Sequence, residues 1–132
     1  MKKLLVISII ILSVLACKKT KFSPEGPTDI RVKNISAFNF TDIIVNTSDG
    51  IDTLGDAVAE GGLSEYKRFN KAYVKAEISA KINSELFYTG TVDYTGLTYI
   101  GQAKITYEVW VTDIVNKKLE MRILYPLDGP LE

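Results

Sequence analysis

Apolar and polar residues alternate along most of the chain from Asp29 onward. The alternation is clearest over residues 72–82, where every even-numbered residue is apolar and the odd-numbered residues between them are polar or amphipathic. A strand places positions two apart on one face, whereas a helix spreads them around its circumference. The pattern therefore predicts a strand over 72–82 with one face directed into a core.

Two later runs repeat this pattern. In residues 104–112 the odd-numbered positions are apolar and expected inside, while the even-numbered ones, including Trp110, are expected to face outward. Tyr107 in this run is interpreted as a core aromatic, with a tyrosine-corner role as the alternative. The inward row of the last strand is expected to consist of Leu119, Met121, Ile123 and Tyr125.

Turn signals separate these runs. Asp49-Gly50 is typical of a hairpin turn in which both central residues adopt positive φ, and Asn83-Ser84 marks another turn. The four prolines lie outside residues 29–125, as expected for a sheet because proline cannot donate to a strand ladder. Residues 51–63 combine helical spacing with glycines, so a short strand and a loop are expected there, with at most one helical turn.

These features predict an all-β domain, an antiparallel β-sandwich of about seven to eight strands. The rhythm of the pattern resembles the small immunoglobulin-like or transthyretin-like sandwiches found in many lipoproteins of unassigned function. The resemblance lies in the start at Asp29, in Ser64-Glu65-Tyr66 after Gly61-Gly62, and in Gly101 leading into residues 105–109.

The first seventeen residues have a different character. Lys2 and Lys3 precede an uncharged apolar run over residues 4–16, which ends at Cys17, the only cysteine. A cationic start followed by about 7–15 apolar residues is typical of a secretory signal peptide. The run is shorter than the roughly 18 residues that a membrane-spanning helix needs.

Val14-Leu15-Ala16-Cys17 resembles the lipobox of bacterial lipoproteins. The resemblance implies cleavage between Ala16 and Cys17 and attachment of acyl chains to Cys17, which would hold the protein on a membrane. Because Lys18 is not an aspartate, the resemblance also favours the outer membrane. An ordinary secretory signal with a stray cysteine and an uncleaved anchor are the alternatives.

The expected organisation is a cleaved signal peptide over 1–16, a lipidated cysteine with a flexible tether over 17–28, a β domain over 29–126 and a tail over 127–132. Residues 18–28 are rich in lysine, proline and glycine, and fully extended they reach about 36–40 Å. Cleavage leaves 116 residues with a side-chain charge of −2. That balance lacks the basic surface expected of a nucleic-acid-binding protein.

Catalytic chemistry has few candidates in this sequence. The chain has no histidine, which excludes Ser-His and Cys-His nucleophilic systems, and no cofactor or metal is expected. Asp49, Asp52 and Asp56 supply oxygen atoms for a calcium loop, but Val45 and Thr47 occupy earlier EF-hand ligand positions. A carboxylate pair remains formally available among Asp42, Asp49, Asp52, Asp56, Glu60 and Asp93.

Aromatic residues are the candidates for a binding surface. Trp110 lies on the polar side of its strand, and exposed tryptophan and tyrosine are frequent at binding hot spots. Tyr73 and Tyr99 are expected to share that surface. The alternative is that Trp110 packs under a neighbouring loop or under residues 126–132.

Three functions follow from these observations. The favoured hypothesis is a non-catalytic, lipid-anchored module of the outer membrane that binds a protein or glycan partner. The first alternative is a carboxylate-dependent hydrolase, which requires a concave pocket holding two acids with raised pKa values. The second alternative is an envelope assembly or inhibitor protein that acts by β-augmentation and requires an exposed sheet edge.

Overall fold

The computed structural model describes residues 22–132. The expected signal peptide, the Ala16–Cys17 cleavage and lipidation site, and the first part of the tether lie outside the described residues. Residues 22–132 contain no helix long and apolar enough to cross a membrane.

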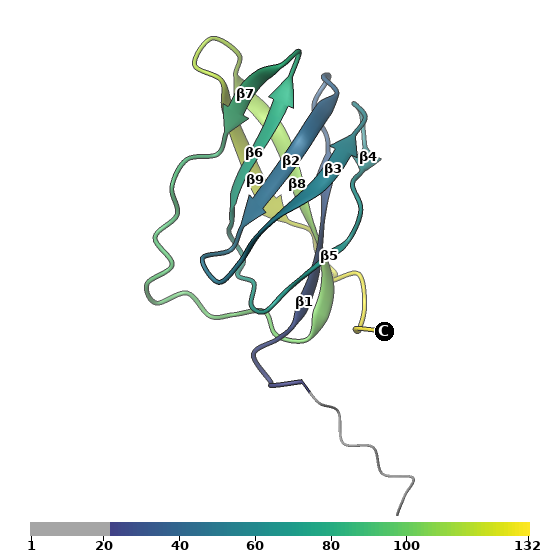
Figure 1. Ribbon diagram of the computed structural model, residues 1–132, viewed down its shortest axis with the longest axis vertical. Helices are drawn as coiled ribbons and strands as arrows, with labels where there is room; N and C mark the ends of the chain where they lie inside the picture. Colours follow the sequence, from purple (N-terminus) through teal and green to yellow (C-terminus); the bar gives the residue numbers. More distant parts are fainter. Residues whose placement is uncertain (1–21) are drawn as a thin grey trace, which may run out of the picture.

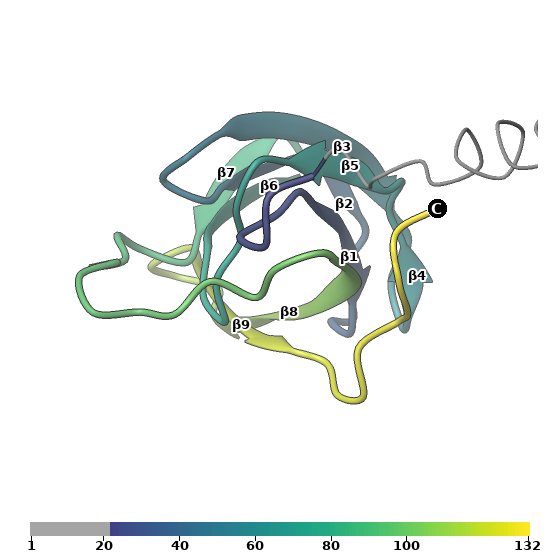
Figure 2. The ribbon, with the colours of Figure 1, turned by 90° about the horizontal axis from the view of Figure 1, so that it is seen from below.

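Nine strands form one sheet that curls into a nearly closed barrel (Figures 1 and 2). The sheet order is β3-β2-β6-β7-β9-β8-β1-β4, and β5 also pairs with β1. The prediction of an all-β domain is confirmed. The strands are β1 (Thr28–Asn34), β2 (Phe40–Asn46), β3 (Ile51–Ala57), β4 (Gly62–Leu63), β5 (Lys67–Phe69), β6 (Glu77–Ile82), β7 (Glu85–Tyr88), β8 (Ala103–Asp113) and β9 (Lys118–Ile123).

The sheet is mixed, so the expected antiparallel sandwich is corrected. β1 and β8 run parallel in continuous register from Thr28↔Ala103 to Asn34↔Val109, and β7 meets β9 in parallel at Tyr88↔Lys118. Alternation fixes which face of a strand is buried but carries no information about its neighbour. Strands far apart in sequence are not joined by a tight turn, so their relative direction is free.

The barrel is incompletely paired at two places: between β7 and β9, and between the two ends of the strand order, where single hydrogen bonds replace a ladder. β7 and β9 share only the Tyr88↔Lys118 pair, which leaves a seam between them. At the ends of the strand order, Asn34 Nδ2 donates to the carbonyl of Ala57 at 3.0 Å and Glu65 N donates to that of Leu54 at 3.3 Å. These bonds join β3 to β1 and to the segment after β4.

Strand direction gives the barrel two distinct ends. β1, β3, β6 and β8 run one way, and the other strands run the opposite way. The connections 35–39, 58–61, 83–84 and 114–117 therefore meet at one end, which we call the apical end. The connections 47–50, 70–76 and 89–102 meet at the other, the basal end, where the chain also enters from residue 22 (Figure 1).

The core largely follows the predicted alternation. The row predicted in 72–82 is buried at Ala72, Ala76, Ile78, Ala80 and Ile82. The strand itself covers only Glu77–Ile82, and Val74 is exposed, because the chain before β6 is irregular apart from one bridge between Tyr73 and Tyr99.

Tyr107 is fully buried, and its hydroxyl donates to the carbonyl of Tyr73. Burial raises the pKa of this hydroxyl. A tyrosine corner bonds to backbone a few residues upstream, whereas Tyr73 lies 34 residues earlier. Tyr107 is therefore a core aromatic with a long-range hydrogen bond.

The ends of the strands differ from expectation at two places, Tyr125 and the β2–β3 hairpin, whereas residues 51–63 agree with it. Tyr125, predicted to point inward, is 65% exposed because β9 ends at Ile123. Asn83-Ser84 forms the expected turn with positive φ at both residues, but in the β2–β3 hairpin the positive φ falls on Ser48 rather than on Asp49-Gly50. Residues 51–63 form β3 and β4 without a helical turn.

The chain is packed against the domain from residue 22, earlier than the expected tether boundary. Gln102 Nε2 donates to the carbonyl of Ser23 at 2.7 Å, and Lys71 pairs with Glu25 at 3.2 Å. Gly26 is buried against the carbonyl of Asn70, where a Cβ atom would clash. A glycine that signalled a flexible linker in the sequence here permits close backbone contact.

The expected tail over 127–132 also joins the sheet. Lys104 N donates to the carbonyl of Gly129 at 2.8 Å, and Asp128 N donates to that of Lys104 at 3.0 Å. The tail therefore adds a short pairing to β8 and brings the Asp128 carboxylate onto the outer face of the barrel.

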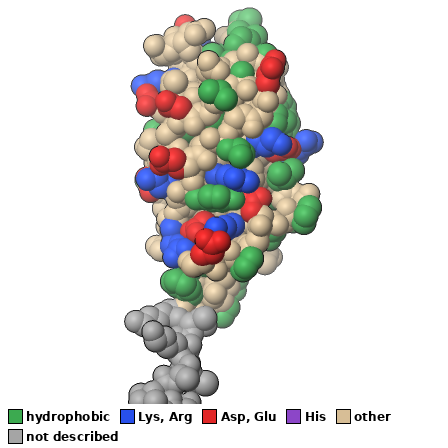
Figure 3. Space-filling view, turned by 90° about the vertical axis from the view of Figure 1, so that its right-hand side faces the viewer, with side chains coloured by type: hydrophobic (Ala, Val, Ile, Leu, Met, Phe, Trp, Pro, Cys, Tyr) green, Lys and Arg blue, Asp and Glu red, His purple; other side chains and the backbone are tan. Residues whose placement is uncertain are grey.

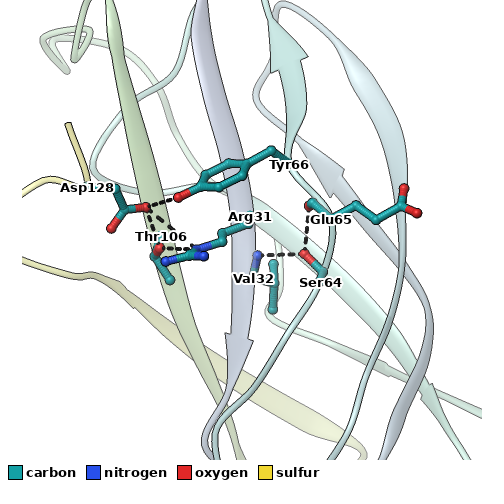
Figure 4. Close-up of polar contacts among 7 residues, drawn as sticks. All are labelled: Arg31, Val32, Ser64, Glu65, Tyr66, Thr106 and Asp128. Carbon is teal, nitrogen blue, oxygen red and sulfur yellow. Dashed lines mark hydrogen bonds and ion pairs between the residues drawn. The ribbon is translucent and has the colours of Figure 1, made fainter. Parts of the chain in front are cut away.

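Asp128 is the centre of a polar network on that outer face (Figure 4). Its Oδ2 accepts hydrogen bonds from the hydroxyls of Tyr66 at 2.7 Å and Thr106 at 2.6 Å. Arg31 Nε donates to Thr106 at 2.9 Å, and its guanidinium carbon lies 4.7 Å from the centre of the Tyr66 ring. The network joins β1, β8, the segment before β5 and the tail.

Ion pairs continue on both sides of this network. Arg122 Nε donates to Glu108 Oε2 at 2.7 Å, with Lys33 Nζ 3.7 Å from Glu108 Oε1, and Arg68 makes two bonds to Asp29. The side that carries β4 and β5 shows acidic and basic side chains interleaved (Figure 3). Thr106 and Glu108, predicted to face outward, do so, but these partners bury them.

We expect Tyr66→Phe to lower the free energy of unfolding by about 0.5–1.5 kcal/mol, the usual value for one lost hydrogen bond. Tyr125→Phe is the matched control, because Tyr125 is exposed, and it should leave stability unchanged. Urea denaturation of the three proteins at neutral pH measures the difference. Equal stability of all three would contradict a stabilising role for the Asp128 network.

The same hydroxyl gives a pH dependence. Burial and the hydrogen bond to Asp128 raise the pKa of Tyr66 to about 12, from 10.0. Between these values the unfolded chain binds fewer protons than the folded protein, so stability falls as pH rises. We expect the free energy of unfolding to fall less steeply for Tyr66→Phe than for the wild type over this interval. Parallel curves would contradict the shift.

Candidate functional site

The predicted aromatic surface is divided between the two ends of the barrel. Tyr73 and Tyr99 form a backbone bridge at the basal end, and the Tyr73 ring lies 5.2 Å from that of Tyr94. Trp110 lies three residues beyond Tyr107 on β8 and on the opposite face of the strand. The structure therefore does not bring Trp110 together with the two tyrosines.

Trp110 is half-buried beside the apical connection 35–38. It pairs with Glu120 of β9, and its indole has Arg122 on one side, with the guanidinium carbon 5.6 Å from the ring centre. This spacing is that of a cation–π contact. Two segments were considered as possible cover for Trp110, a neighbouring loop and the tail. The loop 35–38 lies beside Trp110, whereas the tail pairs with Lys104, toward the basal end.

The space around Trp110 is an open groove of about 530 Å³. Its floor comes from β8 and β9, and one wall comes from the β1–β2 connection. The lining is mainly apolar, with two hydroxyls and one cation: Ile35, Ser36, Ala37, Phe38, Trp110, Val111, Thr112, Ile114 and Arg122. We call this the apical groove.

Arg122 is the charged group of the apical groove. Its Nε is held by Glu108, which also faces Lys33, so one buried carboxylate is shared by two cations. The Arg122 side chain is nevertheless 65% exposed, and within residues 22–132 its two terminal nitrogens make no hydrogen bond. The groove therefore offers an apolar floor with guanidinium donors at its edge.

Exposed apolar residues gather at the same end of the barrel. Ile35, Val58, Ile114 and Val115 all belong to apical connections, and Val115 is 87% exposed. Exposed apolar patches on folded domains often mark sites of interaction with other molecules. The apical groove, which Ile35 and Ile114 line, and the other exposed residues of these connections form a candidate surface at the end farthest from the entering chain.

The carboxylates considered for hydrolysis do not line the apical groove. Asp42 pairs with Lys81 at 3.0 Å, and Asp56 accepts a bond from the Asp42 amide. The pKa of Asp93 is lowered because its carboxylate accepts a bond from the Thr95 amide, which is the opposite of the shift that a general acid needs. The arrangement expected of a hydrolase, two acids in one pocket, is not found in this groove.

The acidic residues considered for calcium have local partners. Asp52 accepts a hydrogen bond from the Thr53 amide at 2.8 Å, and Asp56 accepts one from Asp42. Over residues 22–132 no three acidic, histidine or cysteine side chains are grouped closely enough to hold a metal ion.

The seam between β7 and β9 bears on the β-augmentation hypothesis. Among the described residues, β9 pairs on that side only through Lys118, so its stretch toward Ile123 has no strand partner there. A smaller hollow of about 270 Å³ lies beside it, between Glu120-Met121 and residues 89–92. This edge is the available place for an added strand.

Sequence reasoning missed the β1–β2 connection and Arg122 as parts of a site. The apolar pair Ile35 and Phe38, placed between two strands and outside their alternation, was the available signal. The sequence carried no such signal for Arg122. An arginine on the polar face of a strand is common, and only the structure shows that this one lies beside Trp110.

No family model matches the sequence, and no curated protein matches it either. The fold does have a counterpart among solved structures: an NMR structure of a protein from Eubacterium rectale is similar with a TM-score of 0.52. The match covers 79% of this chain and 94% of that chain at 13% sequence identity, so it shows a shared fold alone.

Proposed function

We propose that this chain is a non-catalytic, lipid-anchored module of the outer membrane that binds a protein or glycan partner at its apical end. The observation that carries the proposal is that the entering chain and the apical groove lie at opposite ends of the barrel. The chain enters at the basal end at residue 22, whereas the apical groove and the exposed apolar residues lie at the far end. Anchored through Cys17, the domain would present its candidate binding surface away from the lipid.

The composition of the apical groove supports binding rather than hydrolysis. Its lining contains no carboxylate, and its one ionised group is a guanidinium. An indole braced by an arginine supplies a rigid apolar face together with hydrogen-bond donors, a combination frequent at hot spots of protein interfaces and suited to stacking against a sugar ring.

β-augmentation is a second candidate, favoured by the seam, because an extended peptide recognises a sheet edge through its backbone. A relationship to immunoglobulin-like or transthyretin-like lipoprotein domains stays a prediction, since two parallel strand pairs depart from the expected sandwich.

Cys17→Ser is expected to remove the protein from the membrane fraction and to leave an unprocessed or soluble form, because serine cannot receive the thioether-linked acyl chains. Ser13→Ala, in the apolar run of the signal, is the control and should leave retention unchanged. Fractionation and mass spectrometry of the processed amino terminus measure both. Normal processing and full membrane retention of Cys17→Ser would overturn the anchor.

A photo-crosslinking residue at Val115 is expected to form a specific adduct in intact cells, whereas the same residue at Ile51, on the basal end, should not form that adduct. Trp110→Ala should abolish the Val115 adduct, and Trp110→Phe should restore part of it.

Because Trp110 is half-buried, Trp110→Ala should cost about 1–3 kcal/mol of stability. Circular dichroism of each variant therefore accompanies the crosslinking. An adduct at Val115 that survives Trp110→Ala in folded protein would contradict binding at the apical groove, and an adduct formed only from β9 would favour β-augmentation.

A further inference from the structure

We propose that the basal end of the domain docks directly on the lipid surface, so that the anchored protein has a fixed orientation instead of floating on a long tether. This inference rests on the proposed lipidation of Cys17 and adds a second, non-covalent contact with the membrane. Three observations lead to it: the short chain between the anchor and the fold, the aromatic and apolar side chains around its attachment, and the cations beside them.

The tether is less than half as long as the sequence indicated. Gln102 Nε2 donates to the carbonyls of Phe22 at 3.3 Å and Ser23 at 2.7 Å, and Glu25 pairs with Lys71, so the described chain contacts the domain from Phe22 onward. Only five residue steps separate Cys17 from Phe22, and a fully extended chain of that length spans at most about 18 Å. An acylated Cys17 would lie at the lipid interface, so the basal end could not move farther from the membrane than this distance.

The basal end carries exposed side chains of the kind that favour a lipid interface. Phe22 is 42% exposed, Tyr99 is 41% exposed and Val74 is 38% exposed, and they come from three segments that meet at this end. Aromatic rings are enriched where the bilayer meets water, because one part of the ring system is apolar and its edge or hydroxyl tolerates a polar environment. Phe22 is the member nearest to the anchor in sequence.

Cations lie beside this apolar set, and the basal connections also carry the carboxylates of Asp49 and Asp93. The Arg68 guanidinium carbon lies 5.5 Å from the centre of the Phe22 ring, and Lys71 and Lys75 belong to the basal connection 70–76. Asp29 and Glu25 pair with Arg68 and Lys71, so these two cations are largely compensated. The segment that leads to the anchor adds Lys18, Lys19 and Lys21, which would strengthen binding to anionic headgroups.

A protein partner is a poorer occupant of this face than the lipid surface. A compact domain of about 100 residues has a radius of gyration near 13 Å, so its diameter exceeds the roughly 18 Å that the tether allows. A folded partner therefore does not fit between the basal end and the membrane, whereas the lipid surface is already within reach.

Brominated lipids test the docking. The lipidated full-length protein is reconstituted into vesicles of phosphatidylethanolamine, phosphatidylglycerol and phosphatidylcholine brominated in the upper acyl chain. Trp110 is the only tryptophan and lies toward the apical end, so its fluorescence in the wild type should not be quenched. In a Trp110→Phe background, Tyr99→Trp should be quenched by the brominated lipid and unaffected by the unbrominated equivalent.

Val74→Trp in the same background provides a second basal probe in case Tyr99→Trp does not fold. Flotation of the vesicles separates the two hypotheses. A protein that floats, with an unquenched probe at positions 99 and 74, overturns docking and leaves the anchor intact. A protein that does not float overturns the anchor, and docking with it. Equal quenching of apical and basal probes would also overturn the proposed orientation.

Discussion

Parallel pairing between β1 and β8 is the interaction on which the rest of the structure depends. It joins the first strand of the fold to its longest strand through seven consecutive register positions. β1 also pairs with β4 and β5, and β8 also pairs with β9 and with the C-terminal segment. Parallel strands cannot be linked by a tight turn, and the long chain between β1 and β8 supplies β2 to β7 of the wall. The parallel pairing also places the amino terminus of β1 and that of β8 at the same end.

The two ends of the barrel consequently have different environments. At the basal end the chain enters, and Thr28 donates through its hydroxyl to the carbonyl of Gly101 at 2.6 Å. At the apical end short connections leave apolar side chains uncovered around Trp110. Between them, the outer face of β1 and β8 is covered by paired charges, with Glu108 and Asp128 as the central acceptors. The charged side chains of this face are therefore paired with one another, whereas exposed apolar side chains remain at the two ends of the barrel.

The sequence predicted well which residues are buried and predicted poorly which strands are neighbours in the sheet. Alternation identified the inward rows that include Ile78 and Val109, because burial depends on local period. It could not identify the β1–β8 pairing, which joins residues 75 positions apart. The same limitation explains the errors at Gly26 and Asp128: proline, glycine and charge are typical of loops, and only tertiary contact shows that these particular residues are packed.

The single pair that joins β7 to β9 has a mechanical consequence. A barrel with so sparse a pairing along one line can change its cross-section by widening there, while the continuous ladders on either side of the line move as intact units. Amide hydrogens along β9 that lack a partner there are exposed to exchange without unfolding of the core. The domain thus combines a continuous ladder at β1 and β8 with a compliant seam that lies one strand away, between β7 and β9.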